Sequence, residues 1–151
     1  MLDGNILLML RQVDICLSLY GNGKLEEMEI TPAQALMLYE MFSIEENQSL
    51  YATDLCVRIG FSRSTVSSTL KQLRKKGFVR MSMDAKDNRK KPIVLTEKAC
   101  EKEAAVKQYM DDLTRCLCRG IPKHDLECMK QTLKIFLANV QQETIGRDNI
   151  C

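Results

Sequence analysis

Tryptophan is absent from this 151-residue sequence, histidine occurs only once, as His124, and eight tyrosine and phenylalanine residues supply all the aromatic rings. So few aromatics disfavour a groove that stacks sugars or unpaired bases. A single histidine excludes sites that need two imidazoles. No apolar run approaches the ~20 residues needed to cross a bilayer, and the N-terminus lacks the basic region and small-residue cleavage site of a secretory signal. The sequence therefore predicts a cytoplasmic protein that does not enter the membrane.

The signatures of catalysis are also missing. The sequence has no glycine-rich phosphate loop, no pair of carboxylates on an apolar face and no nucleophile that pairs with His124. Hydrophobic residues make up 45% and charged residues 28% of the chain, which is the mix of an ordinary globular protein. We expect a single domain over residues 1–151, no enzymatic activity and no cofactor.

Seven cysteines form an odd set with no regular spacing, which predicts reduced thiols that mostly serve as small core residues. Cys16 is interpreted in this way, as a buried filler. Cys116, Cys118, His124 and Cys128 bring four potential metal ligands together around a predicted helix break. Packing is the favoured interpretation of this group, no metal site is predicted, and a thiol sensor at Cys16, Cys116, Cys118 or Cys128 stays open as an alternative.

Positive charge is scarce in the first part of the chain and concentrated in the middle. Residues 1–57 carry a net charge of −7, residues 58–98 carry +9, and residues 99–151 are neutral. Nine excess positive charges within 41 residues repel one another unless a polyanion lies nearby. The middle segment therefore favours binding to nucleic acid.

The apolar periodicity predicts a mostly α-helical chain. A first helix has an apolar stripe that starts at Ile6, and Gly21-Asn22-Gly23 is expected to end it. Thr31, Pro32 and Gln34 have the order of an N-cap, a first helical residue and a capping-box partner, so a second, buried helix should begin there. Beyond Thr96, which is a predicted cap, a long helix should run to about Arg119. After Gly120 a last helix should follow, with a frayed tail from Glu143.

The middle segment predicts two short helices followed by a β-hairpin. The first helix runs from about Thr53 to Ile59 and stops at Gly60. Ser62 caps the second helix, which Gly77 closes. Strands over residues 78–83 and 92–95 enclose a polar, basic tip. The fold class is therefore mostly α with a small hairpin wing, in the pattern of a winged helix-turn-helix.

The second short helix carries small hydroxyl residues near its start and basic residues further along, a composition suited to duplex DNA. Arg63 could contact a guanine base, whereas Lys71, Arg74 and Lys75 are better placed to neutralise phosphates. The predicted DNA-binding residues are Ser62, Arg63, Ser64, Thr65, Ser67, Ser68, Lys71, Arg74, Lys75, Lys86, Arg89 and Lys90.

Several motifs of the chain resemble those of MarR-type transcription regulators. They are the recognition-helix run SRSTVSSTL at 62–70, its continuation at 73–79, Asp87-Asn88-Arg89 in the wing, Leu95-Thr96, Glu97-Lys98-Ala99, and residues 30–34. The resemblance covers nearly the whole chain in order. It implies a winged-helix lobe at about 30–98 and a helical dimerisation region at about 3–21 and 99–142.

The resemblance further implies a homodimer that binds a palindromic operator in double-stranded DNA. Its two recognition helices would lie in major grooves about one turn apart. It assigns Arg89 to the minor groove and Asp87 to holding the Arg89 guanidinium. A repressor released by a small-molecule effector is the expected function. A thiol-based redox regulator of the same fold, an RNA-binding winged helix and a protein-docking winged helix are the alternatives.

Overall fold

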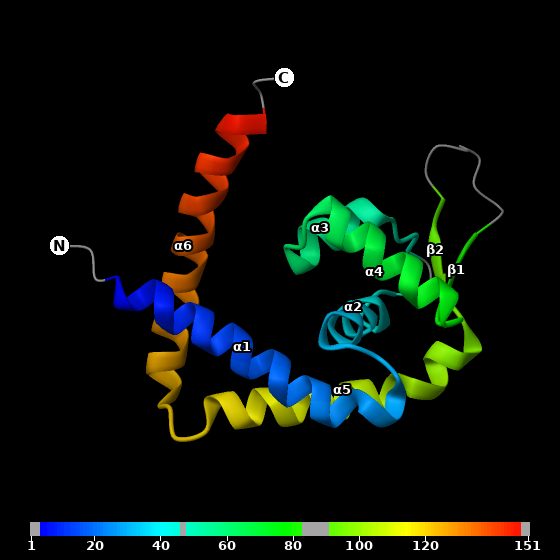
Figure 1. Cartoon of the computed structure of the whole chain (residues 1–151), viewed down its shortest axis with the longest axis horizontal. Coiled ribbons are helices and arrows are strands. Elements are labelled where there is room, and N and C mark those ends of the chain that lie inside the picture. The colour runs from blue at the N-terminus through cyan, green and yellow to red at the C-terminus, as the bar shows by residue number, and fades with distance from the viewer. Residues whose placement is uncertain (1–3, 46–47, 83–90, 149–151) are drawn as a thin grey trace. The chain divides into compact units, whose positions relative to one another are not determined.

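The computed structural model describes residues 4–45, 48–82 and 91–148. Its elements are α1 (Asn5–Leu25), η1 (Glu26–Met28), α2 (Pro32–Phe42), α3 (Ala52–Ile59), α4 (Arg63–Lys75), β1 (Val79–Met81), β2 (Ile93–Leu95), α5 (Glu97–Cys118) and α6 (Lys123–Asp148) (Figure 1). The predicted fold class, mostly helical with a two-stranded hairpin, is confirmed. The chain divides into two compact units, residues 1–111 and 112–151.

Helix α2 is the central helix of the first unit (Figure 1). The predicted capping box is present: the Thr31 hydroxyl accepts the Gln34 N–H at 3.2 Å, and the Gln34 carboxamide oxygen accepts the Thr31 N–H at 3.2 Å. Four apolar residues of α2 are buried, namely Ala35, Met37, Leu38 and Met41. Because these side chains face several directions around the helix, α2 is covered on most sides, as its composition predicts.

The helix-turn-helix and the hairpin follow the predicted order. Helix α3 ends at Gly60, and α4 begins directly after Ser62. Strands β1 and β2 are antiparallel, with Val79 opposite Leu95, and are shorter than the sequence predicts. The Ile93 N–H also donates to the Leu50 carbonyl at 2.8 Å, which ties the hairpin to the segment before α3.

Helix α1 continues through the glycines that were expected to end it, so that prediction is wrong. Gly21 is buried inside the helix, and a Cβ atom there would lie 2.5 Å from Cγ of Pro32 and 2.7 Å from the Tyr109 hydroxyl. Glycine at this position therefore permits the close approach of α1 to α2 and α5. The rings of Tyr20 and Tyr109 stack beside this contact, with centroids 6.3 Å apart.

The two C-terminal helices are separated where the sequence indicates. The Thr96 hydroxyl accepts the Ala99 N–H at 3.4 Å near the start of α5, and Gly120 has a positive φ of 77° between α5 and α6. Helix α6, however, continues to Asp148, which corrects the expectation of a frayed tail from Glu143. That expectation relied on apolar periodicity, which reports burial of a helix face and not helix formation itself. In the described part of the chain, no helix is long and apolar enough to span a membrane.

Candidate nucleic-acid interface

The N-terminus of α4 carries a cluster of hydroxyl groups. Ser62 Oγ accepts the Thr65 backbone N–H at 3.1 Å and lies 3.0 Å from Ser64 Oγ and 2.8 Å from Thr65 Oγ1. All three side chains are exposed. A helix N-terminus favours anions because its free N–H groups and its dipole present positive charge. This end of α4 therefore suits a phosphate or a base edge.

One face of α4 is buried and the rest is exposed, as the sequence predicts. Val66, Leu70 and Leu73 are buried together with Thr69. Residues four apart lie on one ridge of a helix, so Arg63, Ser67, Lys71 and Lys75 form a single exposed ridge. This ridge is built only of hydroxyl and basic side chains. Its charge is not balanced locally, since no acidic residue occurs between Asp54 and Asp84.

A groove of about 680 Å³ runs beside this ridge, between α3, α4 and β1. Apolar side chains such as Val66, Leu70 and Val79 line it together with Arg63, Lys71 and Arg74. The three cations therefore converge on one side of α4, although Arg63 and Arg74 are three turns apart in the sequence. Such a surface attracts a polyanion.

The C-terminus of α4 is closed by the local geometry of Gly77. Gly77 has a φ of 80°, its N–H donates to the Arg74 carbonyl, and the Phe78 N–H donates to the Leu73 carbonyl. These two bonds form a Schellman motif, which leads the chain directly into β1. The position of the hairpin relative to α4 is therefore set by the residue that ends the helix.

Two lysines in this basic region are engaged within the lobe. The Lys76 ammonium donates to the Glu29 carbonyl and to the Gln34 carboxamide oxygen, at 2.5 and 2.9 Å. The Lys98 ammonium donates to the Lys76 carbonyl at 2.7 Å and lies 4.7 Å from the centroid of the Phe78 ring. The net charge of +9 thus overstates the charge that is free to meet a ligand.

The nine predicted DNA-binding residues between Ser62 and Lys75 are all exposed on α4 or at its cap, and the structure brings them together. The predicted wing residues Lys86, Asp87, Arg89 and Lys90 lie outside the described residues. Sequence reasoning did not select Arg80, which is exposed on β1. Its position in the alternating run of the first strand was the available signal.

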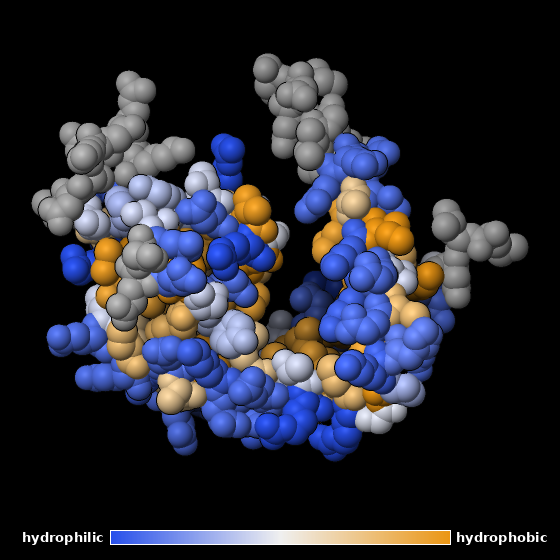
Figure 2. Space-filling view, turned by 180° about the vertical axis from the view of Figure 1, so that it is seen from behind, coloured by the Kyte–Doolittle hydropathy of each residue, from blue (hydrophilic) through white to orange (hydrophobic). Residues whose placement is uncertain are grey.

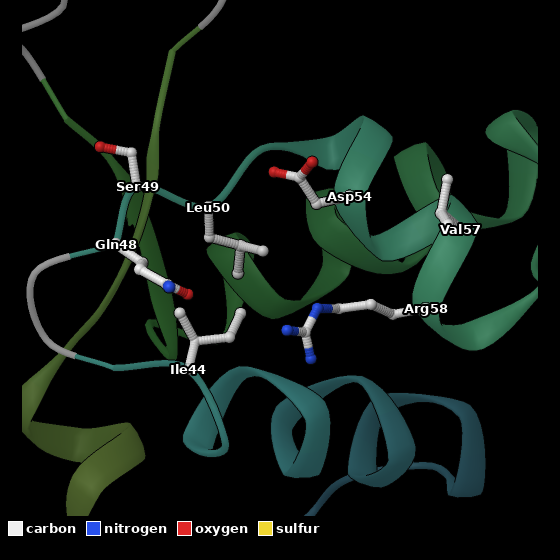
Figure 3. Close-up of a pocket in the computed structure, with 7 residues that line it drawn as sticks. All are labelled: Ile44, Gln48, Ser49, Leu50, Asp54, Val57 and Arg58. Carbon is white, nitrogen blue, oxygen red and sulfur yellow. The ribbon is translucent and has the colours of Figure 1, made fainter.

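A second hollow, of about 450 Å³, lies between the end of α2 and α3 and is lined by Ile44, Gln48, Ser49, Leu50, Asp54, Val57 and Arg58 (Figure 3). Its charged side chains already have partners. Asp54 accepts the Tyr51 N–H at 2.8 Å, and Arg58 lies 3.5 Å from Glu40. The Asp54 carboxylate serves as a cap for α3.

The cysteines differ from the prediction that most of them are core residues. Cys16, Cys100, Cys116 and Cys128 are exposed, and Cys56 and Cys118 are half-buried. The expectation of a buried Cys16 is wrong for the single chain, because helix α1 leaves much of its surface uncovered. Within residues 4–45, 48–82 and 91–148, no three histidine, cysteine or acidic side chains are grouped so that they could hold a metal ion.

Comparison with known proteins gives a consistent result. Residues 29–90 match the model of the MarR family. The structure is similar to that of S. aureus MepR in complex with DNA, at 24% identity and a TM-score of 0.78, over 87% of this chain and 96% of MepR. It is also similar to a MarR protein from Peptoclostridium difficile, at 19% identity and a TM-score of 0.80, over 94% and 91% of the two chains.

A MarR-family regulator from Listeria monocytogenes, solved with a 26mer DNA, is similar at 18% identity and a TM-score of 0.77, over 91% of this chain and 89% of that one. No curated protein sequence gives a significant match. Helix α3, helix α4 and the hairpin define the chain as a winged helix-turn-helix protein. The match to the MarR family model covers helices α2, α3 and α4 and strand β1, and the chain shares the fold of the MarR-type regulators compared above.

Proposed function

We propose that the protein is a homodimeric repressor that binds a palindromic operator in double-stranded DNA and is released by a small-molecule effector in the cytoplasm. The carrying observation is the exposed ridge of α4, which has hydroxyl groups at its N-terminus and only basic charges along its length. Similar structures that hold DNA support the same conclusion. Phosphate contacts would position this helix, and contacts from its N-terminal turn would specify the bases.

Uncovered apolar surface supports the homodimer. On α1, the exposed fractions of Leu7, Leu8 and Leu19 are 73%, 64% and 65%, and on α6 those of Ile135 and Leu137 are 60% and 61%. Apolar side chains, in orange, are visible on the surface in Figure 2. Large exposed apolar side chains gathered on one helix mark a protein interface. A second copy of the chain would cover these side chains, and a two-fold axis would relate the two α4 helices of the dimer.

A third hollow, of about 430 Å³, supports an effector site. It lies between the end of α2, strand β2 and the first turns of α5, and Met41, Phe42 and Ile93 contribute to its apolar lining. Glu45 and Glu103 line it as well. A ligand bound here would contact α5 and the hairpin at once, so it would act on the orientation of the wing.

The wing completes the proposed interface. By resemblance to the family, Arg89 inserts into the minor groove, Asp87 holds its guanidinium, and Lys86 and Lys90 attract phosphates. We therefore expect Arg89→Ala to weaken operator binding strongly while leaving the thermal stability unchanged, because an exposed hairpin tip adds little to a core. A gel-shift titration beside a thermal melt tests this, and unchanged affinity would remove Arg89 from the interface.

A salt titration tests the proposed reading of DNA. The probes are a palindromic duplex that the protein enriches from a random pool and a scrambled duplex of the same composition. Arg63→Ala should lower the preference for the enriched duplex, since a lost base contact reduces discrimination by ~1–3 kcal/mol. Lys75→Ala should weaken both duplexes and lower the salt slope by about 2 per dimer. Equal losses for both variants on both duplexes would show that Arg63 contacts no base.

An RNA-binding winged helix remains the alternative outcome of the same experiment. A dimer that reads DNA should bind the palindrome as one dimer per duplex. An RNA-binding protein should instead prefer an A-form duplex or a single strand of the same sequence.

A thiol-based regulator of the same fold is the second candidate, and the exposed cysteines favour it. Cys128 Sγ lies 3.6 Å from His124 Nε2, one helical turn away on α6. A peroxide can oxidise an exposed thiol to a sulfenic acid, with one peroxide oxygen transferred to sulfur and the other released as water. Peroxide should then release DNA from the parent protein but not from the variant in which Cys16, Cys100, Cys116, Cys118 and Cys128 are serine. Release from both would exclude the substituted cysteines as the sensor.

A further inference from the structure

A buried amide links the recognition helix to the start of α2. The exposed fraction of Gln34 is only 1%, although Gln34 is a polar residue. Its Nε2 donates to Oε1 of Gln72, on α4, at 2.7 Å, and its Oε1 accepts from Nζ of Lys76 at 2.9 Å. Oε1 also accepts the Thr31 N–H. One side chain thus forms hydrogen bonds with the N-cap of α2, with Gln72 of α4 and with Lys76 at the C-cap of α4.

The same connection extends to the turn before α2. Lys76 also donates to the Glu29 carbonyl, and Glu29 has a left-handed backbone with a φ of 56°. Such a conformation costs a non-glycine residue free energy and persists where the surroundings hold it. The hydrogen bond from Lys76 helps to stabilise this backbone conformation. The C-terminal turn of α4 and the strained turn after α1 therefore stabilise each other.

Gln72 and Lys76 lie on a different side of α4 from the proposed DNA ridge. Each residue advances ~100° around a helix, so Gln72 lies about a quarter-turn from Lys71, and Lys76 lies about a quarter-turn from Lys75. Their side chains are directed to α2 by the hydrogen bonds just described. They occur in the most basic stretch of the chain, yet their contacts are internal.

We infer that Gln34, Gln72 and Lys76 are positioning residues that hold α4 in the orientation required to read DNA; this inference rests on the proposed function. Lysines that neutralise phosphates tolerate a small displacement of the helix because their stems are flexible. Base contacts do not, because bidentate hydrogen bonds need a fixed geometry. Loss of these links therefore lowers the preference for the operator more than the general affinity for DNA.

Two substitutions at Gln72 distinguish a positioning role from a direct phosphate contact, because the two roles predict opposite rankings of the variants. Gln72→Glu keeps an acceptor for Gln34 Nε2 and places a carboxylate four residues before Lys76, a favourable helical pair. Gln72→Met removes the acceptor at nearly the same helix propensity. A positioning role predicts that Met lowers the ratio of enriched to scrambled duplex affinity by about tenfold, the order of one lost hydrogen bond, whereas Glu preserves the ratio. A direct phosphate contact predicts that Glu is the more harmful change.

Lys76→Met and Lys75→Met form a second pair, one residue apart. Lys76→Met leaves Gln34 bonded to Gln72 and Thr31, so the lobe keeps its fold, which circular dichroism verifies. We expect Lys76→Met to lower the affinity ratio with an unchanged salt slope, and Lys75→Met to lower the salt slope by about 2 per dimer with an unchanged ratio.

The outcomes distinguish a failure of the positioning role from a failure of the proposed function. If Lys76→Met lowers only the melting temperature, or reduces the salt slope as Lys75→Met does, the positioning role is overturned while DNA binding stands. The same holds if Gln72→Glu is worse than Gln72→Met. If the parent protein enriches no duplex from the random pool, the proposed function itself fails, and the inference fails with it.

Discussion

Helices α4 and α6 are both amphipathic in sequence, yet they differ in what they bury. The 13 residues of α4 bury Val66, Thr69, Leu70 and Leu73. Helix α6 has 26 residues, and among its described side chains only Leu126 and Phe136 are even half-buried. The winged-helix lobe therefore has a core of its own, whereas the large apolar side chains described on α6 are mostly exposed. Apolar periodicity identifies a helix face that is to be buried. It does not show whether the same chain or a second chain buries that face.

The strongest test of this contrast is Leu137→Asp on α6, with Val57→Asp on α3 as the matched control. The exposed fractions of the two residues are 61% and 85% in the single chain. If a second copy covers α6, a dimer must bury two carboxylates, and its dissociation constant should rise by at least ~100-fold. Val57→Asp should leave the constant unchanged. Sedimentation equilibrium measures both, and an unaltered dimer of Leu137→Asp would place the interface elsewhere.

Gly21 and Gly23, near the end of α1, allow a position in close contact to be compared with an open position in the same helix. Gly21→Ala should destabilise the protein by about 1–3 kcal/mol, because the new methyl group overlaps Pro32 and Tyr109. A Cβ atom at Gly23 would meet no atom of the described residues within 4 Å. Gly23→Ala should therefore stabilise the helix by about 0.5–1 kcal/mol. Urea unfolding of both variants gives the signs, and equal signs would contradict the close approach at Gly21.

The cap of α4 tests whether the lobe is stable on its own. Ser62→Ala removes the acceptor for the Thr65 N–H and should cost about 1 kcal/mol. Ser67→Ala, in the middle of the same helix, should be neutral or slightly stabilising. The loss for Ser62→Ala should not depend on protein concentration, since the cap is internal to one chain. Thermal melts at several concentrations measure it, and a loss confined to low concentration would refute this view of the lobe.

The smallest expected effect is a pH dependence at Tyr109. Burial, and next the charge of neighbouring Tyr20, raise the pKa of the Tyr109 phenol above its usual value. Above pH ~10 the unfolded chain loses this proton before the folded chain does, so stability falls as pH rises. Well below that pH, where both states keep the proton, this group contributes nothing to the pH dependence. Tyr109→Phe should flatten the decline in unfolding free energy between about pH 9 and 11, and identical slopes would exclude the effect.

The parts of the fold that were predictable depend on residues close in sequence. The capping box of Thr31 and Gln34, the cap at Ser62 and the end of α4 at Gly77 are each fixed within a few positions. Gly21 shows the limit of such signals. A glycine that ends a helix and a glycine that lets two helices touch have the same sequence signature, and only the position of Pro32 and Tyr109 separates them.

The candidate site was predictable to the same degree. The exposed ridge of α4 follows from helical spacing and charge. The links from Gln34 to Gln72 and Lys76 were not predictable, because the partners are 38 and 42 residues apart and glutamine has no preferred partner type. For the same reason, the sequence did not distinguish Lys76 from Lys75, although Lys76 is half-buried and bonded to Gln34 whereas Lys75 is exposed.

The contact between Lys76 and the Glu29 carbonyl also fixes where three carboxylates lie. Glu26, Glu27 and Glu29 are exposed on the turn that this lysine holds at the C-terminal end of α4. Their negative charge repels phosphates at the limit of the basic ridge. We therefore expect a sharp edge to the footprint of this protein on DNA, set by repulsion at the end of α4 as much as by attraction along it.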